Sequence, residues 1–484
     1  IESVTGGTAA DTVTFGAAIA GATVNLGSGS DSLTLANGTN TITAAGIESI
    51  AGNAGNDTVA LTGTVTGATY DLKAGTDTLT LDAGTGANTL TASGVETLTG
   101  GGGDDDVTLT GGVTGGSYTL GAGADKLTLG GASTLTLDGS IESLVGSTGA
   151  DTITMSAAVA TGTTIDLGLG SDKLNLADGG NTVTLNASVE TLVGGAGADL
   201  ITLTQSVINM QVDSAGGADQ LVLANGANIL QVSNLESITG NAGADQITLR
   251  TSVTNGQFNL AAGTTDRIVL SDADNSLTTT AVETVTGGTG ADTLVLADTS
   301  TGGVFNLGAG TDNLTLSTGA NTLTASNIES ITGVGGDDTV TLGAASTNTV
   351  IDLAGGTDQL NLADGTNAIT ASNVETIVGN SGADTVTLHG QTTRLGAPAT
   401  PYLAIGDTVR LEMTGRDGLS VFGAIVQQPA QQAQAGQLQE LIGFFRFEAG
   451  STARALPRVG EPQVGAYKPT HKALIDEGQF VSFT

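Results

Sequence analysis

The sequence predicts an all-β protein, a parallel β-solenoid of stacked coils with a short mixed C-terminal tail. Three observations predict it: an internal repeat of 46 to 48 residues, short strands in which apolar and polar residues alternate, and turns rich in Gly and Asp between those strands. A single coil built from such short strands is too small to enclose a core alone. It buries its apolar face only by stacking on its neighbours.

The repeat is marked by the phrase IES, VET or LES, which begins at Ile1 and recurs as far as Val374. Eight full repeats and part of a ninth therefore form an array over residues 1–390. The chain opens inside a repeat, which indicates a fragment of a longer protein. Residues 391–484 are not repetitive and contain all six prolines, and we expect a cap or docking region there.

Each repeat contains two aspartate turns, and a strand with period-2 alternation follows each of them directly. We interpret each repeat as two unequal coils, with the aspartate turns on one edge of the solenoid. A third turn in most repeats holds Asn. The first series of turn aspartates is Asp11, Asp57, Asp105, Asp151, Asp199, Asp245, Asp292, Asp338 and Asp384, and the second series is Asp31, Asp77, Asp125, Asp172, Asp219, Asp266, Asp312 and Asp358.

Composition limits the classes of partner that the chain is expected to bind. The 484 residues carry a net charge of −35 although only 13% of them are charged, so nearly all charges have the same sign. Such a balance disfavours nucleic acid and anionic membrane surfaces as partners, and it favours cations. No apolar run reaches the ~18 residues of a membrane span. The absence of Cys fits an extracellular bacterial protein and also fits the cytosol.

Stacked aspartate turns predict a cation. Carboxylates ~5 Å apart repel by ~3 kcal/mol at an effective dielectric constant near 20, and a cation between neighbouring turns would reverse that sign. Carboxylate and backbone carbonyl oxygens are a ligand set that suits Ca²⁺ better than Mg²⁺. We therefore expect Ca²⁺ as the cofactor, with all seventeen turn aspartates as candidate ligands. The alternative is that each Asp only caps a tight turn.

Several turns share one pattern, as in LGSGSDSLT (26–34), LGAGADKLT (120–128) and GGAGADLIT (194–202). They resemble the nonapeptide G-G-x-G-x-D-x-U-x of the RTX, or hemolysin-type calcium-binding, repeats. The resemblance implies that Asp and turn carbonyls bind Ca²⁺ between the coils of a parallel β-roll in a secreted protein. In that family the motif recurs every nine residues on both edges. The longer intervals here predict calcium on one edge only, and an extra residue in 213–221 and 260–268 makes Asp219 and Asp266 weaker candidates.

One glutamate also recurs in each repeat, and either solvent exposure or a secondary role as a cation ligand explains it. The glutamates are Glu2, Glu48, Glu96, Glu142, Glu190, Glu236, Glu283, Glu329 and Glu375.

No catalytic constellation is evident in the array, whose one histidine is His389. In the tail, residues 401–428 resemble the C-terminal strands of the fumarylacetoacetate hydrolase family, but that family's acidic metal-binding cluster has no counterpart upstream.

These observations predict a non-enzymatic, calcium-binding structural region of a secreted or bacterial cell-surface protein, such as an adhesin, an S-layer protein or a filament component. Its expected partners are calcium ions, copies of itself, and other surface proteins or polysaccharide. One alternative is an export and folding repeat of a secreted enzyme or toxin whose active domain is outside this chain. A second alternative is a hydrolase activity carried by the tail.

Overall fold

A computed structural model describes residues 1–389 except 264 and 383, together with five short strands farther along the chain. All regular structure in these residues is β-strand, and the predicted parallel β-solenoid is confirmed. The chain divides into two compact units, Ile1–Arg250 and Thr251–Thr484, and each unit is a stack of coils of the same kind.

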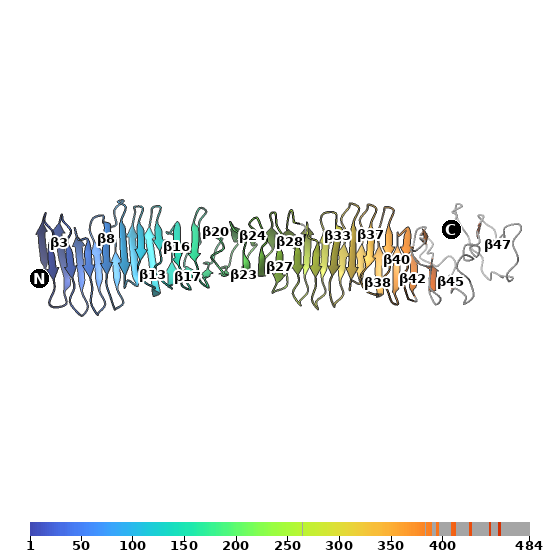
Figure 1. Ribbon diagram of the computed structural model, residues 1–484, viewed down its shortest axis with the longest axis horizontal. Coiled ribbons are helices and arrows are strands. Elements are labelled where there is room, and N and C mark those ends of the chain that lie inside the picture. Colours follow the sequence, from blue (N-terminus) through green and yellow to red (C-terminus); the bar gives the residue numbers. More distant parts are fainter. Residues whose placement is uncertain are drawn as a thin grey trace. The chain divides into compact units, whose positions relative to one another are not determined.

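In the first unit, each strand pairs in parallel with the strand two places along the chain, so odd-numbered and even-numbered strands form two separate sheets (Figure 1). The odd strands are β1 (Ser3–Gly7), β3 (Ala20–Gly27), β5 (Thr41–Ala45), β7 (Thr58–Leu61), β9 (Thr78–Thr80), β11 (Thr97–Gly101), β13 (Thr114–Gly121), β15 (Thr134–Leu137), β17 (Thr152–Met155), β19 (Lys173–Asn175), β21 (Thr191–Val193), β23 (Ile208–Asp213), β25 (Ile229–Ser233) and β27 (Gln246–Leu249). The even strands are β2 (Thr12–Thr14), β4 (Ser32–Thr34), β6 (Ser49–Ala51), β8 (Thr66–Asp71), β10 (Thr89–Ser93), β12 (Asp106–Leu109), β14 (Lys126–Thr128), β16 (Ser143–Ser147), β18 (Thr164–Gly168), β20 (Thr182–Leu185), β22 (Leu200–Leu203), β24 (Gln220–Val222) and β26 (Ser237–Thr239).

The second unit follows the same rule. Its even strands are β28 (Gly256–Asn259), β30 (Ser276–Thr280), β32 (Thr293–Leu296), β34 (Asn313–Thr315), β36 (Ser330–Thr332), β38 (Thr347–Asp352), β40 (Ala368–Ser372), β42 (Thr385–His389) and β44 (Thr408–Glu412). Its odd strands are β29 (Arg267–Val269), β31 (Thr284–Thr286), β33 (Thr301–Asn306), β35 (Thr322–Ser326), β37 (Thr339–Leu342), β39 (Gln359–Asn361), β41 (Thr376–Val378) and β43 (Arg394–Leu395).

Parallel pairing continues past residue 390 into β43 and β44, and β45 (Ile425–Gln427) pairs with β44 in antiparallel orientation. Two further strands, β46 (Phe445–Arg446) and β47 (Arg454–Ala455), pair with each other. Apart from these short strands, the predictions for 391–484 lie outside the described residues, including those drawn from the resemblance of 401–428.

The repeat spans two and a half coils, and the expectation of two coils was wrong. From β2 to its equivalent β7 the chain passes through five strands, and each coil uses two. The sequence interpretation placed strands after aspartate turns. It therefore missed those, such as β3 and β8, that begin at a corner without a carboxylate. The coils are short, because the number of residues between paired positions is the length of one coil. Thr58 pairs with Thr41 in the coil before it and with Thr78 in the coil after it.

A β-bulge occurs at the start of six strands that lack this carboxylate, β3, β8, β13, β23, β33 and β38. The register shifts between Ala20 and Ala22 in β3, and the residue between them, Gly21, has a φ of 76°. Gly67 and Asn209 occupy the equivalent positions with φ values of 67° and 64°. Gly and Asn are the residues that adopt this left-handed conformation at least cost.

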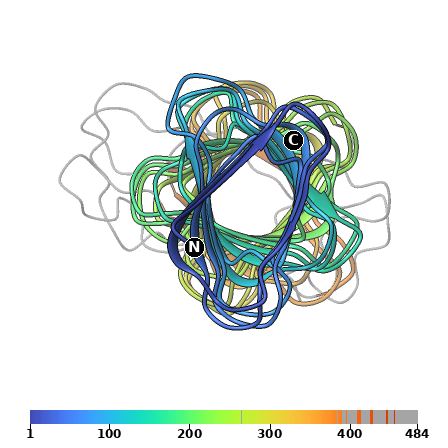
Figure 2. The same cartoon turned by 90° about the vertical axis from the view of Figure 1, so that its left-hand side faces the viewer.

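The core lies between the two sheets of each unit. Alternate residues of the strands from β3 to β42 point inward, and in β7 these are Val59 and Leu61, both buried. Seen along the stack, the first coils, drawn in dark blue, have nearly the same outline (Figure 2). The turns that join the sheets therefore stack on one another along each edge.

Candidate metal-binding ladders at the coil corners

The aspartates of both series lie at coil corners, directly before a strand. Asp11 precedes β2 in the even sheet, whereas its equivalent Asp57 precedes β7 in the odd sheet. The prediction that all aspartate turns share one edge was therefore wrong. Because a repeat ends half a coil out of phase, each motif moves to the opposite edge in the next repeat. We call the edge before odd strands the odd edge and the other the even edge.

On each edge, the corner residues of four consecutive coils are Asn, Asp, Asp and Glu in that order, and we call such a set a ladder. In one ladder, Asp105 Oδ1 accepts a hydrogen bond from the main-chain N–H of Asn88 at 3.0 Å. Asp125 Oδ1 accepts from the N–H of Asp105 at 2.8 Å, and Glu142 Oε2 accepts from the N–H of Asp125 at 2.9 Å. Each side chain thus bonds the backbone of the coil that precedes it in the chain.

The same pattern recurs in both units. Complete ladders in the first unit are Asn40–Asp57–Asp77–Glu96, Asn88–Asp105–Asp125–Glu142, Ser133–Asp151–Asp172–Glu190 and Asn181–Asp199–Asp219–Glu236. Those in the second unit are Asn275–Asp292–Asp312–Glu329 and Asn321–Asp338–Asp358–Glu375. The remaining aspartates, Asp11, Asp31, Asp245, Asp266 and Asp384, make rung contacts of the same kind.

All seventeen predicted aspartates therefore occupy the second or third rung of a ladder. Asp219 and Asp266, which the sequence marked as weaker, make the same contacts as the others: Asp219 Oδ1 accepts from Asp199 N–H, and Asp266 N–H donates to Glu283 Oε2.

The first rung is Asn because this corner needs a donor as well as an acceptor. Asn181 Nδ2 donates to Asp199 Oδ1 at 2.8 Å and to two turn carbonyls, those of Ala177 and Gly179. Its Oδ1 accepts from the N–H of Val159 at 2.9 Å. A carboxylate has no hydrogen to donate to the next Asp.

The glutamates form the last rung of each ladder rather than a separate column. Glu142 is half-buried, Oε2 accepts from Asp125, and its own N–H turns back to Asp125 O at 3.1 Å. The role of these residues was not identified from the sequence. The signal was present in the spacing, since Glu142 follows Asp125 by one coil length.

Sixteen of the seventeen aspartates, all except Asp11, are at most 2% exposed. Their two carboxylate oxygens are in different environments. Oδ1 accepts from the neighbouring coil, whereas Oδ2 is buried without a hydrogen-bond partner in most second-series residues and in some of the first. Such an oxygen is costly to bury unless a cation or a proton compensates it. The Oδ2 atoms in this position are those of Asp31, Asp57, Asp77, Asp125, Asp172, Asp199, Asp219, Asp312, Asp338 and Asp358.

Burial raises the pKa of six second-series carboxyls, those of Asp77, Asp125, Asp172, Asp219, Asp312 and Asp358. For Asp77 the pKa rises to about 6, chiefly through burial, although the hydrogen bond from the Asp57 N–H opposes the rise. The negative charges of Asp57 and Glu96, the rungs on either side, add to the rise. The pKa values of Asp125, Asp219, Asp312 and Asp358 also rise to about 6, with burial as the largest cause.

The turns bring carbonyl oxygens toward these carboxylates. A Cβ atom placed on Gly170 would lie 2.6 Å from Asp172 Oδ1 and 2.7 Å from Gly149 O, the carbonyl of the preceding coil. A Cβ on Gly29 would likewise lie 2.8 Å from Asp31 Oδ1 and 2.7 Å from Ala9 O. Carboxylate and carbonyl oxygens that converge on one space fit a hard cation such as Ca²⁺. In the described part of the chain, no three His, Cys, Asp or Glu side chains converge on one point, so backbone oxygens would have to complete the ligand set.

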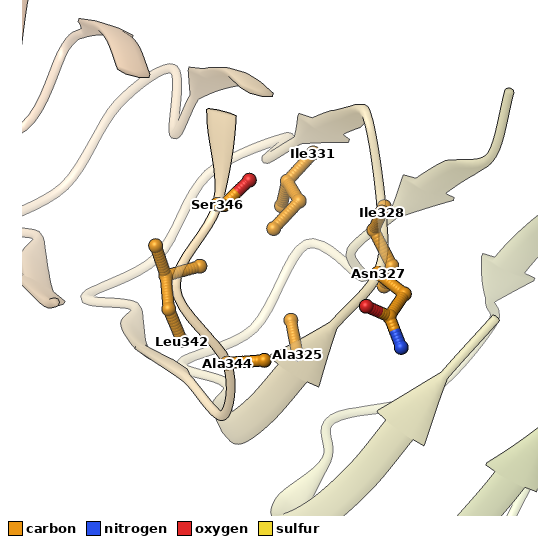
Figure 3. Close-up of a pocket in the computed structure, with 7 residues that line it drawn as sticks. All are labelled: Ala325, Asn327, Ile328, Ile331, Leu342, Ala344 and Ser346. Atoms are coloured by element: carbon orange, nitrogen blue, oxygen red, sulfur yellow. The ribbon is translucent and has the colours of Figure 1, made fainter. Parts of the chain in front are cut away.

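A small cavity in the second unit is lined by apolar and small polar residues (Figure 3). It leaves about 10 Å³ for the centre of a water-sized molecule, which is room for a single water. Its lining residues are Ala325, Asn327, Ile328, Ile331, Leu342, Ala344 and Ser346.

Comparison of the chain with protein-family models, with curated protein sequences and with solved structures finds no match. Within the described residues, no helix is long and apolar enough to cross a lipid bilayer.

Proposed function

We propose that the array is a non-enzymatic structural scaffold of a secreted or bacterial cell-surface protein, and that its ladders bind Ca²⁺. The observation that carries the proposal is the set of buried Oδ2 atoms without hydrogen-bond partners, repeated on both edges of the coils. A chain of net charge −35 that buries these carboxylates gains stability from any bound cation that neutralises them.

The ligands in this proposal are the Asp side chains of rungs two and three together with carbonyls of the glycine turns. A role as an adhesin, S-layer or filament component accords with a long repetitive array. Its proposed partners are then copies of itself, other surface proteins or polysaccharide.

The direct test is unfolding by circular dichroism after exhaustive removal of divalent ions, and again after addition of CaCl₂. We expect the melting temperature to rise with calcium concentration, since a ligand that binds only the folded state stabilises it. Mg²⁺ at the same concentration should have a smaller effect, because it demands a more rigid octahedral site. An identical strand signal and melting temperature with and without calcium would count against the proposal.

Two charge-matched variants separate a specific site from general screening. Asp312→Asn removes the buried Oδ2 but keeps an acceptor for the Asp292 N–H, whereas Asp298→Asn removes the charge of an exposed residue. We expect the first variant to weaken the calcium-induced stabilisation and the second to leave it near the wild-type value. Equal effects would show that calcium acts only by screening.

A further inference from the structure

The ladders of one edge are separated by a break. In five of the six complete ladders, the Glu N–H bonds back to the carbonyl of the third-rung Asp in the preceding coil, and no side chain of the next coil accepts from it. On the odd edge, for example, Glu190 is followed by Met210, whose side chain has no oxygen. The next ladder begins one coil later, where Asn228 Oδ1 accepts from Val207 N–H at 3.2 Å.

Each break lies opposite the middle of a ladder on the other edge. The coils that carry Glu190 and Met210 are joined on the even edge by two bonds: Asn181 N–H donates to Asp199 Oδ1, and Asp199 N–H donates to Asp219 Oδ1, both at 2.8 Å. The break between Glu142 and Thr163 on the even edge similarly faces the Ser133–Asp151–Asp172 bonds of the odd edge. The stagger follows from the two and a half coils of each repeat.

We infer that this half-integer repeat has a mechanical role: within each unit, it staggers the breaks so that neighbouring coils keep side-chain hydrogen bonds to each other on at least one edge. A whole-number repeat would keep each motif on one edge, where its breaks would recur without this alternation. Two coils that have no side-chain hydrogen bond between them at a break are then held together by the aspartates on the opposite edge. The inference concerns hydrogen bonds and is independent of calcium.

Some breaks also have a hydroxyl bond of their own. At the break between Glu96 and Gly116, the Tyr118 hydroxyl donates to Val95 O, and at the break between Glu48 and Ala68, the Tyr70 hydroxyl donates to Ile47 O. At the break between Glu190 and Met210 the equivalent residue is Val212, which has no hydroxyl. That level has no hydroxyl bond of this kind, so it depends on the opposite edge and is a suitable place for a test.

The test is hydrogen–deuterium exchange of folded protein, measured by mass spectrometry on peptides that cover β21 and β23, at the break. We expect Asp199→Ala to speed exchange there on the order of tenfold or more, because the bonds lost on the even edge are charge-assisted. Asp199→Asn keeps the acceptor and should leave exchange near the wild-type rate. It also separates this inference from calcium binding, which that variant should weaken.

The matched control is Glu236→Ala, which also removes one carboxylate and one acceptor of a backbone N–H, but opposite an intact stretch of the odd edge. It should speed exchange only beside its own rung, in β24 and β26. Wild-type exchange at β21 and β23 in Asp199→Ala, or equal opening there in Glu236→Ala, would overturn the inference.

Should Asp199→Ala fail to fold, Tyr118→Phe provides the second test, since it removes only the hydroxyl bond at a break. The Asp105 bonds on the opposite edge should then keep exchange in β11 and β13 within about fivefold of the wild-type rate. A tenfold or larger rise there would show that the opposite edge does not hold the level together, and would refute the inference.

Discussion

At the scale of single residues, one core position shows how a hydroxyl group compensates for a missing rung. Tyr70 and Tyr118 lie three residues beyond the bulge residues Gly67 and Gly115 and are 1% exposed, and their hydroxyls donate to carbonyls of the preceding coil. Burial raises the pKa of both phenols, so they remain neutral donors at any physiological pH. Phe305 occupies the equivalent core position in the second unit and makes no such bond, because it lacks the hydroxyl.

Phe305→Tyr should therefore stabilise the protein. The spacing between Tyr118 and Val95 is the same as that between Phe305 and Val282, so the new hydroxyl is expected to reach Val282 O. We expect a gain of about 1 kcal/mol in the free energy of unfolding, measured by urea denaturation. Tyr118→Phe should lose a similar amount. A destabilised Phe305→Tyr protein would show that the hydroxyl does not reach the carbonyl.

At the scale of the element, the ladder shows why its polar residues differ from rung to rung. Only the side chain of the first rung has to donate a hydrogen bond to an Asp. The second and third rungs need a short side chain that accepts a hydrogen bond within a tight corner. The side chain of the last rung accepts from a main-chain N–H while it is itself half-buried. In the third repeat, Ser133 takes the first rung, accepts from Val113 N–H and donates to Gly131 O. Ser thus satisfies the corner's main-chain groups but offers no amide donor to Asp151.

Asn181→Asp should destabilise the first unit by ~1–3 kcal/mol, because it removes three donated hydrogen bonds and places a second carboxylate against Asp199. Asn181→Ser copies the arrangement of the third repeat and should cost clearly less. The order of the two urea midpoints at pH 7 checks this, and an Asp variant as stable as the Ser variant would contradict the assigned role of the amide.

The solenoid was predictable from the sequence because periodicity and alternation act over many residues. The phase of the coils was not, because a strand such as β8 begins at a bulge at Gly67 and has no aspartate before it. The seventeen corner aspartates were recognisable from their turns. The roles of Asn181 and Glu142 depend on which corners stack, and that follows only once the half coil per repeat is known.

At the scale of the whole molecule, buried carboxylates on a chain of net charge −35 make stability depend on pH. The pKa values of Asp77, Asp125 and Asp219 rise in the folded protein from an ordinary value of 3.8 to about 6. Between these values the folded state binds more protons than the unfolded state, so the free energy of unfolding falls as pH rises through this window.

Without divalent ions, the urea midpoint should therefore decrease from about pH 4 to pH 6 and then level off, as far as these groups determine it. With calcium present, the loss above pH 6 should be recovered, because the ionised carboxylates are the form that binds it. Midpoints measured at several pH values after dialysis, with and without CaCl₂, check both expectations. A metal-free midpoint that rises across this window would contradict the raised pKa values.

The half coil left over by each repeat also constrains how the array can change length. Inserting or deleting a single repeat turns everything downstream by half a revolution, so that a surface formerly on one side of the stack faces the other. Only changes of two repeats preserve orientation. A partner that binds one side of this chain will therefore meet the same residue pattern at every second repeat, and its binding sites will be spaced two repeats apart.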